Sequence, residues 1–199
     1  VFIDFEMHSQ DLSILKDVYD SRYIQAKPFH ALGRLHDPRL DKITLTAFEA
    51  SYGDSDLSGT AGLDLTKDRP SLIAHLSSRK LDLRTFIASP SKNQPPNQAA
   101  VPSTRSRERL FSREPLDLAP LQQIDANVSF QGKAILLQRM ALNDVDTQLR
   151  LIKGDLHVDP LKLNIGGGTA EGTFTLKTSS TRPFLATHLS VHHLDIAPI

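Results

Sequence analysis

Histidine is the residue in this sequence with the most chemical potential, because its ring serves as a metal ligand and as a general base. His75 and His188 each open a His-Leu-Ser stretch, and His192 and His193 follow the second stretch. In an extended strand, residues four apart lie roughly 13 Å from each other, too far to bind one ion together. We therefore expect these histidines to face solvent or to serve structural roles, and we predict no metal site.

Two other short motifs could bind ions or phosphate. Gly166–Gly168 does not lead into a helical pattern and lacks the Lys-Ser/Thr pair of a phosphate-binding loop, so a turn explains this run better. Asp54–Asp56 offers two calcium-type ligands but has no spaced Glu to complete a calcium loop. Hairpin turns account for both motifs.

A cluster of arginines could contact anionic headgroups, although we favour a solvated linker as its explanation. The cluster consists of Arg105, Arg107, Arg109 and Arg113. No Ser-His-Asp arrangement or pair of carboxylates stands out as a catalytic centre. We predict no catalytic residue and no cofactor, and we expect the function to reside in a surface.

Composition narrows the class of protein further. The 199 residues carry 23 basic and 23 acidic side chains, which argues against a nucleic-acid-binding protein. The chain has no cysteine, so it has neither disulfides nor a thiolate metal site. No apolar run approaches the roughly 20 residues needed to cross a bilayer. Because the chain opens on Val1 inside an apparent strand and ends on apolar Ile199, we expect a fragment of a longer protein.

The chain repeats itself without a gap at an offset of 113 residues. Lys42–Phe86 aligned with Asp155–Ile199 gives 12 identities in 45 positions, including Gly59 with Gly172. Repeats commonly bury or display one continuous surface rather than build a single reaction centre. The unit is too long for a small solenoid repeat, so we expect several strands in each copy.

Alternation of apolar and polar residues predicts strands in both copies. Residues 124–131 alternate throughout, and 48–52 alternates like its equivalent 161–165. A short turn and two further strands follow in each copy, over 57–65 and 72–77 in the first. We predict a mainly β fold in which two related antiparallel β-meander modules form a curved, groove-like sheet with one or two short helices.

Other segments set the predicted boundaries. Asp11 is a suitable N-cap for a short helix over 11–19. Residues 88–114 are rich in Pro, Ser and Gln and predict a disordered linker between a first module, 1–87, and a second module, 115–199. A Leu-Asp signature recurs at 81–86, 116–121 and 194–199, where we expect a crossover or a short helical turn.

The apolar side of these strands is the candidate functional surface. If nothing covers it, this side forms a patch larger than a soluble monomer usually exposes, and acyl chains would fit it. The alternative is an ordinary core, covered by a second sheet or by the predicted helix. The candidate groove residues are Phe48, Ala50, Tyr52, Leu57, Leu63, Leu72, Leu76, Ile124, Val128, Phe130, Leu161, Leu163, Ile165, Phe174, Leu176, Leu185 and Leu189.

The second half of the chain resembles the AsmA family of Gram-negative envelope proteins. The resemblance rests on Arg109–Leu116, on the alternating stretch Gln123–Val128, and on the glycine-bearing stretch Leu161–Phe174. It covers Arg109–Ile199 well, and it extends to Lys42–Phe86 through Tyr52–Gly59. These are degenerate β-repeat motifs of moderate specificity.

The resemblance implies a bridge-like lipid transfer protein whose β modules line an apolar groove. Such proteins are anchored in the inner membrane, here through a segment outside this chain, and extend into the periplasm to support outer-membrane biogenesis. The implied partners are phospholipid and other envelope proteins. The rival interpretation is an envelope scaffold with closed β cores, and an enzyme acting on lipid or glycan is a more distant third.

Overall fold

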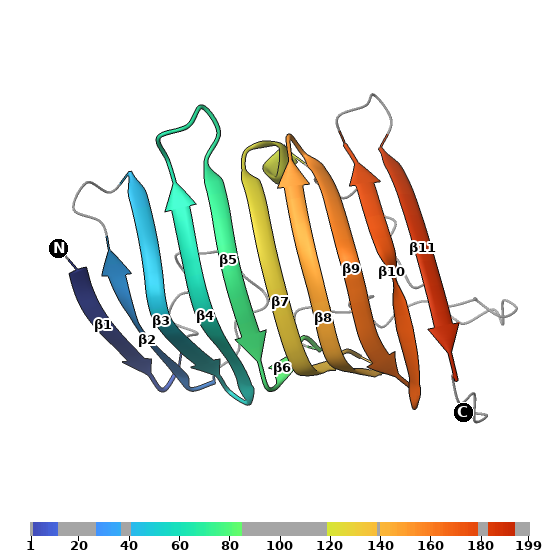
Figure 1. The fold of residues 1–199 in the computed structure, drawn as a ribbon. Helices are drawn as coiled ribbons and strands as arrows, with labels where there is room; N and C mark the ends of the chain where they lie inside the picture. Colours follow the sequence, from blue (N-terminus) through green and yellow to red (C-terminus); the bar gives the residue numbers. More distant parts are fainter. Residues whose placement is uncertain are drawn as a thin grey trace, which may run out of the picture.

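One large β-sheet dominates the computed structural model, which describes residues 2–11, 27–36, 41–84, 119–138, 140–178 and 183–193. In this part of the chain eleven strands join a single sheet in the order β1-β2-β3-β4-β5-β7-β8-β9-β10-β11, and β6 pairs with β7 (Figure 1). The strands are β1 (Phe2–Ser9), β2 (Phe29–His36), β3 (Lys42–Tyr52), β4 (Ser55–Asp64), β5 (Ser71–Ser78), β6 (Leu81–Asp82), β7 (Asp125–Leu136), β8 (Ala141–Ile152), β9 (Asp155–Ile165), β10 (Gly168–Lys177) and β11 (Phe184–His192).

The sheet consists of two antiparallel runs joined by one parallel pair. Strands β1 to β5 pair antiparallel in sequence order, and β7 to β11 do the same. Between the runs, β5 and β7 pair in parallel. The predicted mainly β, groove-like sheet is confirmed, and the parallel junction is an addition to it. A parallel pair requires a long crossover, and here the chain needs residues 79–124 to return to the start of β7.

Helical structure in the described residues is limited to one 3₁₀ turn, Ala119–Gln122, which overlaps one of the Leu-Asp signatures. The first signature differs from our expectation, because Leu81–Asp82 forms the short strand β6 on β7. The predicted helix over 11–19 and the linker over 88–114 lie outside the described residues. The division into modules 1–87 and 115–199 stays a prediction.

The sequence repeat coincides with the strands. β3 and β9 begin and end 113 residues apart, as do β4 and β10, and β5 and β11 begin 113 residues apart. The irregularities repeat as well. A β-bulge interrupts β3 between Leu45 and Phe48, and the equivalent bulge interrupts β9 between Val158 and Leu161. The repeat is therefore structural down to single residues.

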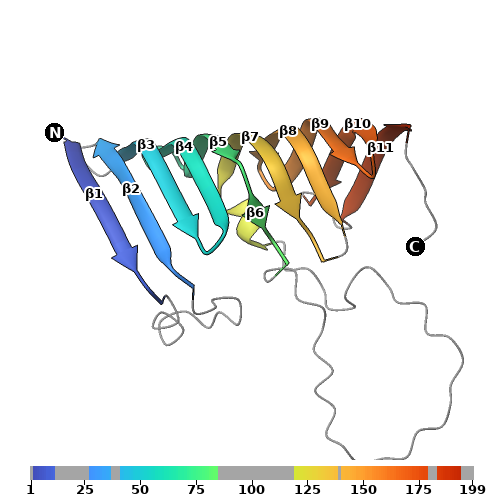
Figure 2. The same ribbon diagram turned by 90° about the horizontal axis from the view of Figure 1, so that it is seen from below.

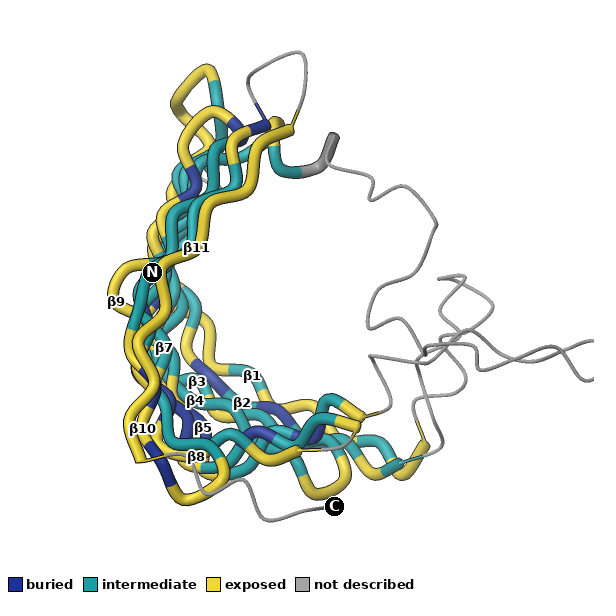
Figure 3. The backbone as a smooth tube through the Cα atoms, turned by 90° about the vertical axis from the view of Figure 1, so that its right-hand side faces the viewer, coloured by how far each residue is buried: buried dark blue, intermediate teal, exposed yellow. Residues whose placement is uncertain are grey.

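These bulges lie in a sheet that curls without closing. Figure 3, which looks along the row of strands from the β11 side, shows a C-shaped cross-section that is open on one side. Figure 2 shows the lower halves of the strands turning away from the straight row of their upper halves. A bulge bends its strand and increases the local twist. Further register shifts in β2 and β8 mean that the strands on both sides of the junction share this bend.

A glycine in the middle of β4 and β10 allows the strands to approach closely at the bend. A Cβ atom on Gly59 would overlap the carbonyl oxygen of His75, and a Cβ on Gly172 would overlap that of His188. Gly59 also has a φ of +148°, which residues with side chains rarely adopt. The identity of these two positions in the repeat therefore has a steric cause.

Carboxylates tie the junction together at both ends. At one end, Asp125 Oδ1 accepts hydrogen bonds from the Lys153 backbone N–H at 2.8 Å and from Arg69 Nε at 3.2 Å. The Asp125 N–H in turn donates to the Pro70 carbonyl oxygen at 2.9 Å. The pKa of Asp125 is lowered, mainly by the hydrogen bond from Lys153 and then by the positive charge of Arg69. One side chain thus joins two loops to the start of β7.

At the other end, Asp56 closes the turn that leaves β5. Its carboxylate accepts hydrogen bonds from Ser78 Oγ, from the backbone N–H groups of Arg79 and Lys80, and from Arg79 Nε at 2.6 Å. Partial burial acts to raise the pKa of Asp56, but these hydrogen bonds outweigh it and lower the pKa to about 2. The ionised carboxylate therefore stabilises this turn.

Candidate functional site

One face of the sheet carries almost all of the aliphatic side chains, and strand register defines it. Residues that are paired across neighbouring strands point to the same side of a sheet. The pairs connect Leu63 to Leu72, and Leu72 through β7 and β8 to Leu156 on β9. The complete row runs Ile43, Leu63, Leu72, Ala126, Leu151, Leu156, Leu176 and Leu185. It crosses both repeats without interruption.

Two further rows extend this surface, which we call the apolar face. The second row is Leu45, Ala61, Ala74, Val128, Leu149, Val158, Phe174 and Thr187. The third row is Phe48, Gly59, Leu76, Phe130, Thr147, Leu161, Gly172 and Leu189. The parallel β5–β7 junction keeps these rows in register, so the two repeats form one surface.

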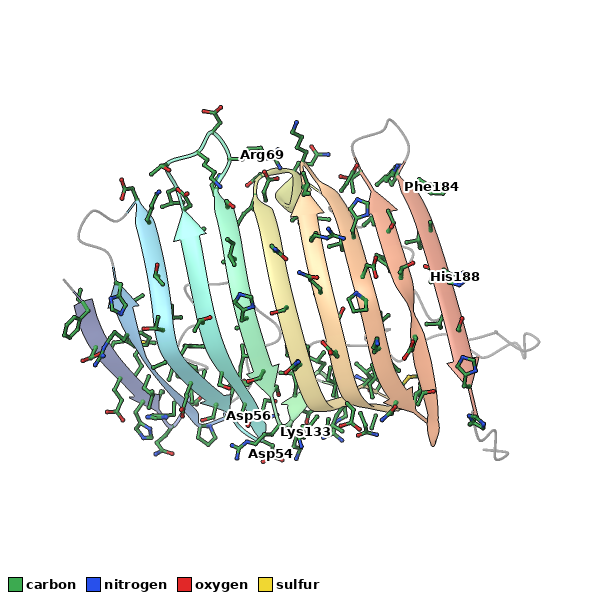
Figure 4. The ribbon with its side chains drawn as sticks, viewed as in Figure 1. Asp54, Asp56, Arg69, Lys133, Phe184 and His188 are labelled. Carbon is green, nitrogen blue, oxygen red and sulfur yellow. The ribbon has the colours of Figure 1, made fainter. Side chains whose placement is uncertain are left out.

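The apolar face lines the inside of the curl. The convex side of the sheet faces the viewer in Figure 4, where side chains with nitrogen and oxygen atoms stand on the fronts of the strands, including the labelled His188. Figure 3 shows that the opposite side is concave. The register agrees, because His188 alternates with Leu189 and belongs to the other face.

The predicted groove residues come together on this face. All of them except Ile124 lie in strands, and the register places each of these on the apolar face. Ile124 immediately precedes β7. That these residues hold lipid stays a prediction, whereas their grouping on one side is a property of the fold.

Sequence reasoning missed a second set of apolar-face residues. Ile43 and Leu45 precede the bulge in β3, so counting every second residue back from Phe48 assigns them to the wrong side. Leu156 and Val158 precede the equivalent bulge in β9. An extra residue reverses the alternation, and the break in period at Thr46–Ala47 and Asp159–Pro160 was the available signal. The other missed residues are Ile3, Phe5 and Met7 on β1, Phe29, Ala31 and Leu35 on β2, and Val145, Leu149 and Leu151 on β8.

The apolar face is only partly covered. Among the described residues no large side chain is fully buried, and the most buried apolar residues include the small Ala31, Ala74 and Ala170. Leu63, Leu76 and the other large residues of the central rows keep part of their surface accessible. No second layer of described structure packs on this face. The covered-core alternative therefore has no counterpart in the part of the chain that the structure describes.

The histidines lie outside the curl. His75 Nδ1 and Ser129 Oγ are 2.7 Å apart across the β5–β7 junction, and His188 is exposed on β11. Over the described ranges, no three His, Asp or Glu side chains come together in a way that could hold a metal ion. The interaction of His75 with Ser129 gives this histidine a structural role in holding the junction.

A hollow of about 780 Å³ crosses β2 to β8 on the outer, polar side. Its lining mixes both signs of charge, with Glu49, Asp144 and Asp146 alongside Arg79 and Lys133. The acid within it that is most strongly perturbed, Asp56, already accepts four hydrogen bonds from the turn after β5. This arrangement favours no ligand of a single charge, so the apolar face remains the better candidate.

An open, curled single sheet with a continuous apolar inner face defines a class of β-groove proteins. Among such proteins, the AsmA family matches residues 24–198 of this chain. The AsmA family protein YhjG of Escherichia coli (strain K12) is 27% identical over 169 residues, which is 75% of this chain. Because the family match spans most of the sequence, the chain belongs to the AsmA family, whose members are associated with the cell envelope.

The chain spans about a quarter (24%) of the length of YhjG. No solved structure matches the chain. Within the described parts of the chain, none of the helical segments has the length and apolar character needed to span a bilayer.

Proposed function

We propose that this chain is part of a periplasmic, non-enzymatic protein that shields phospholipid acyl chains along its apolar face and so supports outer-membrane biogenesis. Polar headgroups would project from the open side of the curl into water. The full-length protein would be anchored in the inner membrane through a segment outside this chain, and other envelope proteins are its expected partners. Passage of lipid along the groove requires no bond chemistry and no cofactor.

The observation that carries this proposal is the uninterrupted set of apolar rows across the β5–β7 junction. Leu63, Leu72 and Ala126 are register partners, so the apolar surface does not end where the first repeat ends. An acyl chain stabilised by contact with aliphatic side chains gains little from direction or sequence, because the hydrophobic effect is non-directional. A continuous surface of this kind suits a lipid that slides.

The test is native mass spectrometry of the protein purified from bacterial membranes in mild detergent, followed by lipid extraction and identification. We expect bound phospholipid, and we expect its occupancy to fall in Leu63→Asp and Leu176→Asp, which place a charge at equivalent positions of the two repeats. The matched control is Ile73→Asp, because Ile73 is 53% exposed on the outer face. Circular dichroism of each variant reports whether the sheet remains folded.

The rival function, an envelope scaffold with closed cores, predicts a different pattern. In a closed core an unpaired charge at Leu63 would be buried at a large cost, and the variant would unfold rather than only lose lipid. Protein that is well folded but carries no lipid, in the wild type and in the Ile73→Asp control, would contradict the proposed function.

A further inference from the structure

The two edge strands of the sheet expose an unusual share of apolar surface. The exposed large hydrophobic residues of the described chain number eleven, and seven of them lie on β1 or β11. These seven are Phe2, Ile3, Met7, Phe184, Leu185, Leu189 and Val191. Every described residue of β11 is exposed. Both edges therefore have the composition of strands that are covered by a neighbour.

Strand β11 also lacks the devices that protect a sheet edge. Its nine residues include no Lys, Arg, Asp, Glu or Pro. Natural proteins usually place charges, prolines or bulges on an edge strand, because a bare row of backbone N–H and C=O groups is a template for another strand. The unprotected edge of β11 is suited to receive one.

The fold contains a template for the strand that would fit. β11 is the repeat equivalent of β5, and β5 pairs in parallel with β7, the first strand of the following run. The first strand of the chain's own first run is β1, which occupies the same place beside β2 as β7 does beside β8. We propose that β1 of a second copy of this chain pairs in parallel with β11, as β7 does with β5.

The register of this pairing follows from the rows of the apolar face. Leu76 on β5 is paired with Phe130 on β7. The repeat equivalent of Leu76 is Leu189, and Phe5 occupies on β1 the row that Phe130 occupies on β7. Leu189 of one copy therefore lies beside Phe5 of the next. Leu and Phe are the same pair of residue types that fills the internal junction.

The neighbouring positions in this register are also compatible. On the apolar face, Val191 lies beside Met7 of the second copy. On the outer face, His188 lies beside Asp4 and Ser190 beside Glu6, so a strand without acids meets a strand with two of them. A head-to-tail contact of this kind does not close on itself, and it generates open-ended assemblies. The apolar face would continue from copy to copy.

The first experiment measures the mass of the protein by sedimentation over about a hundredfold range of concentration. We expect the mass to rise with concentration in open-ended steps. Ser190→Glu places like charges opposite each other at Glu6 and should weaken association about two- to fivefold, whereas Ser190→Lys should strengthen it. Thr60→Glu is the matched control, because Thr60 is exposed on the outer face of an interior strand, and it should leave association unchanged.

The second experiment tests the register by oxidative cross-linking, which the absence of natural cysteine makes clean. Glu6→Cys combined with Ser190→Cys should give a ladder of cross-linked chains. The control combines Glu6→Cys with Ala186→Cys, four residues out of register and roughly 13 Å too far along the strand. β1 and β11 lie at opposite ends of the sheet, so a bond within one chain does not compete (Figure 1).

A protein that stays monomeric at every concentration would overturn the proposal, as would equal cross-linking of both cysteine pairs. A different polypeptide found on the β11 edge by native mass spectrometry, without self-association, would show that the partner is not a second copy. Strand pairing needs no lipid, so the lipid-binding experiment and this one fail independently.

Discussion

The third strand of each repeat, β5 in the first and β11 in the second, has the same sequence pattern but different neighbours. β5 pairs with β4 and β7, whereas β11 pairs with β10 alone within the described chain. Ala74 on β5 is 3% exposed, and its equivalent Thr187 is exposed. Leu72 and Leu76 are partly buried, but their equivalents Leu185 and Leu189 are 58% and 50% exposed. Burial of a repeated side chain here depends on the adjacent strand.

This comparison teaches that the two copies differ in stability although they share a backbone. Each row of the apolar face is a chain of lateral contacts, and an interior residue has a contact on both sides. In repeat architectures stability is approximately a sum of such neighbour terms. Equivalent substitutions in the two copies should therefore have unequal effects, and the inequality measures the missing neighbour.

The largest inequality is expected for a charge in the second row. Ala74→Asp buries an unpaired carboxylate between β4 and β7 and should lower the free energy of unfolding by about 3 kcal/mol. Thr187→Asp, its equivalent on the edge, should cost about 0.5 kcal/mol. Urea denaturation at a protein concentration where the chain is monomeric measures both. Equal losses would break the comparison and would mean that β11 is already covered.

A smaller inequality is expected at the glycine of the bend. Gly59→Ala forces a Cβ against the His75 carbonyl of an interior strand and at an unfavourable φ, so we expect a loss of about 2 kcal/mol. Gly172→Ala meets the His188 carbonyl, which belongs to the edge strand β11 and has freedom to move away, so we expect about 1 kcal/mol. Thermal unfolding of the two variants compares them, and a larger loss at Gly172 would contradict the steric argument.

The smallest effect distinguishes the turns that follow β5 and β11. The pKa of Asp56 is lowered to about 2, so its stabilising contribution is complete above about pH 4, the ordinary range of the unfolded carboxyl. That contribution is lost as the pH falls from about 4 towards 2. Asp56→Asn should cost about 1 kcal/mol at neutral pH, after allowance for solvent screening, and should flatten the acid limb of the stability curve.

The second repeat provides the control for this pH dependence. Its residue equivalent to Asp56 is Thr169, which carries no charge. Thr169→Val should therefore leave the slope of stability between about pH 4 and 2 unchanged. An unchanged slope in Asp56→Asn would show that the hydrogen bonds around Asp56 do not contribute to acid stability.

Much of the fold could be predicted because each strand announces itself locally. The alternation in 48–52 and 161–165 predicted the ends of β3 and β9, and the repeat predicted that whatever one copy formed the other would form. Turns such as Gly53 and Gly166, which have φ angles of +56° and +54°, were visible as glycine in sequence. The candidate groove residues followed from the same period of two, and the fold gathers those in strands on one face.

Other features could not be predicted, because they depend on contacts between distant segments. Nothing local to Ser71–Ser78 or Asp125–Leu136 indicates that these strands pair in parallel, since the pairing joins residues more than fifty positions apart. The bulges reverse the alternation within β3 and β9, so Ile43 and Leu156 were missed. The role of Asp125 depends equally on two loops that meet only in the folded sheet.

The sequence by itself determined the strands, their repetition and the apolar side of each one, because side-chain alternation and glycine placement act over a few residues. The tertiary structure alone decided that the two repeats share one sheet, that the sheet curls with its apolar face inward, and that β11 is left as an edge. These outcomes depend on register across the β5–β7 junction and on bulges opposite particular partners. Lateral hydrogen bonding between strands, unlike alternation along them, is not encoded within any single strand.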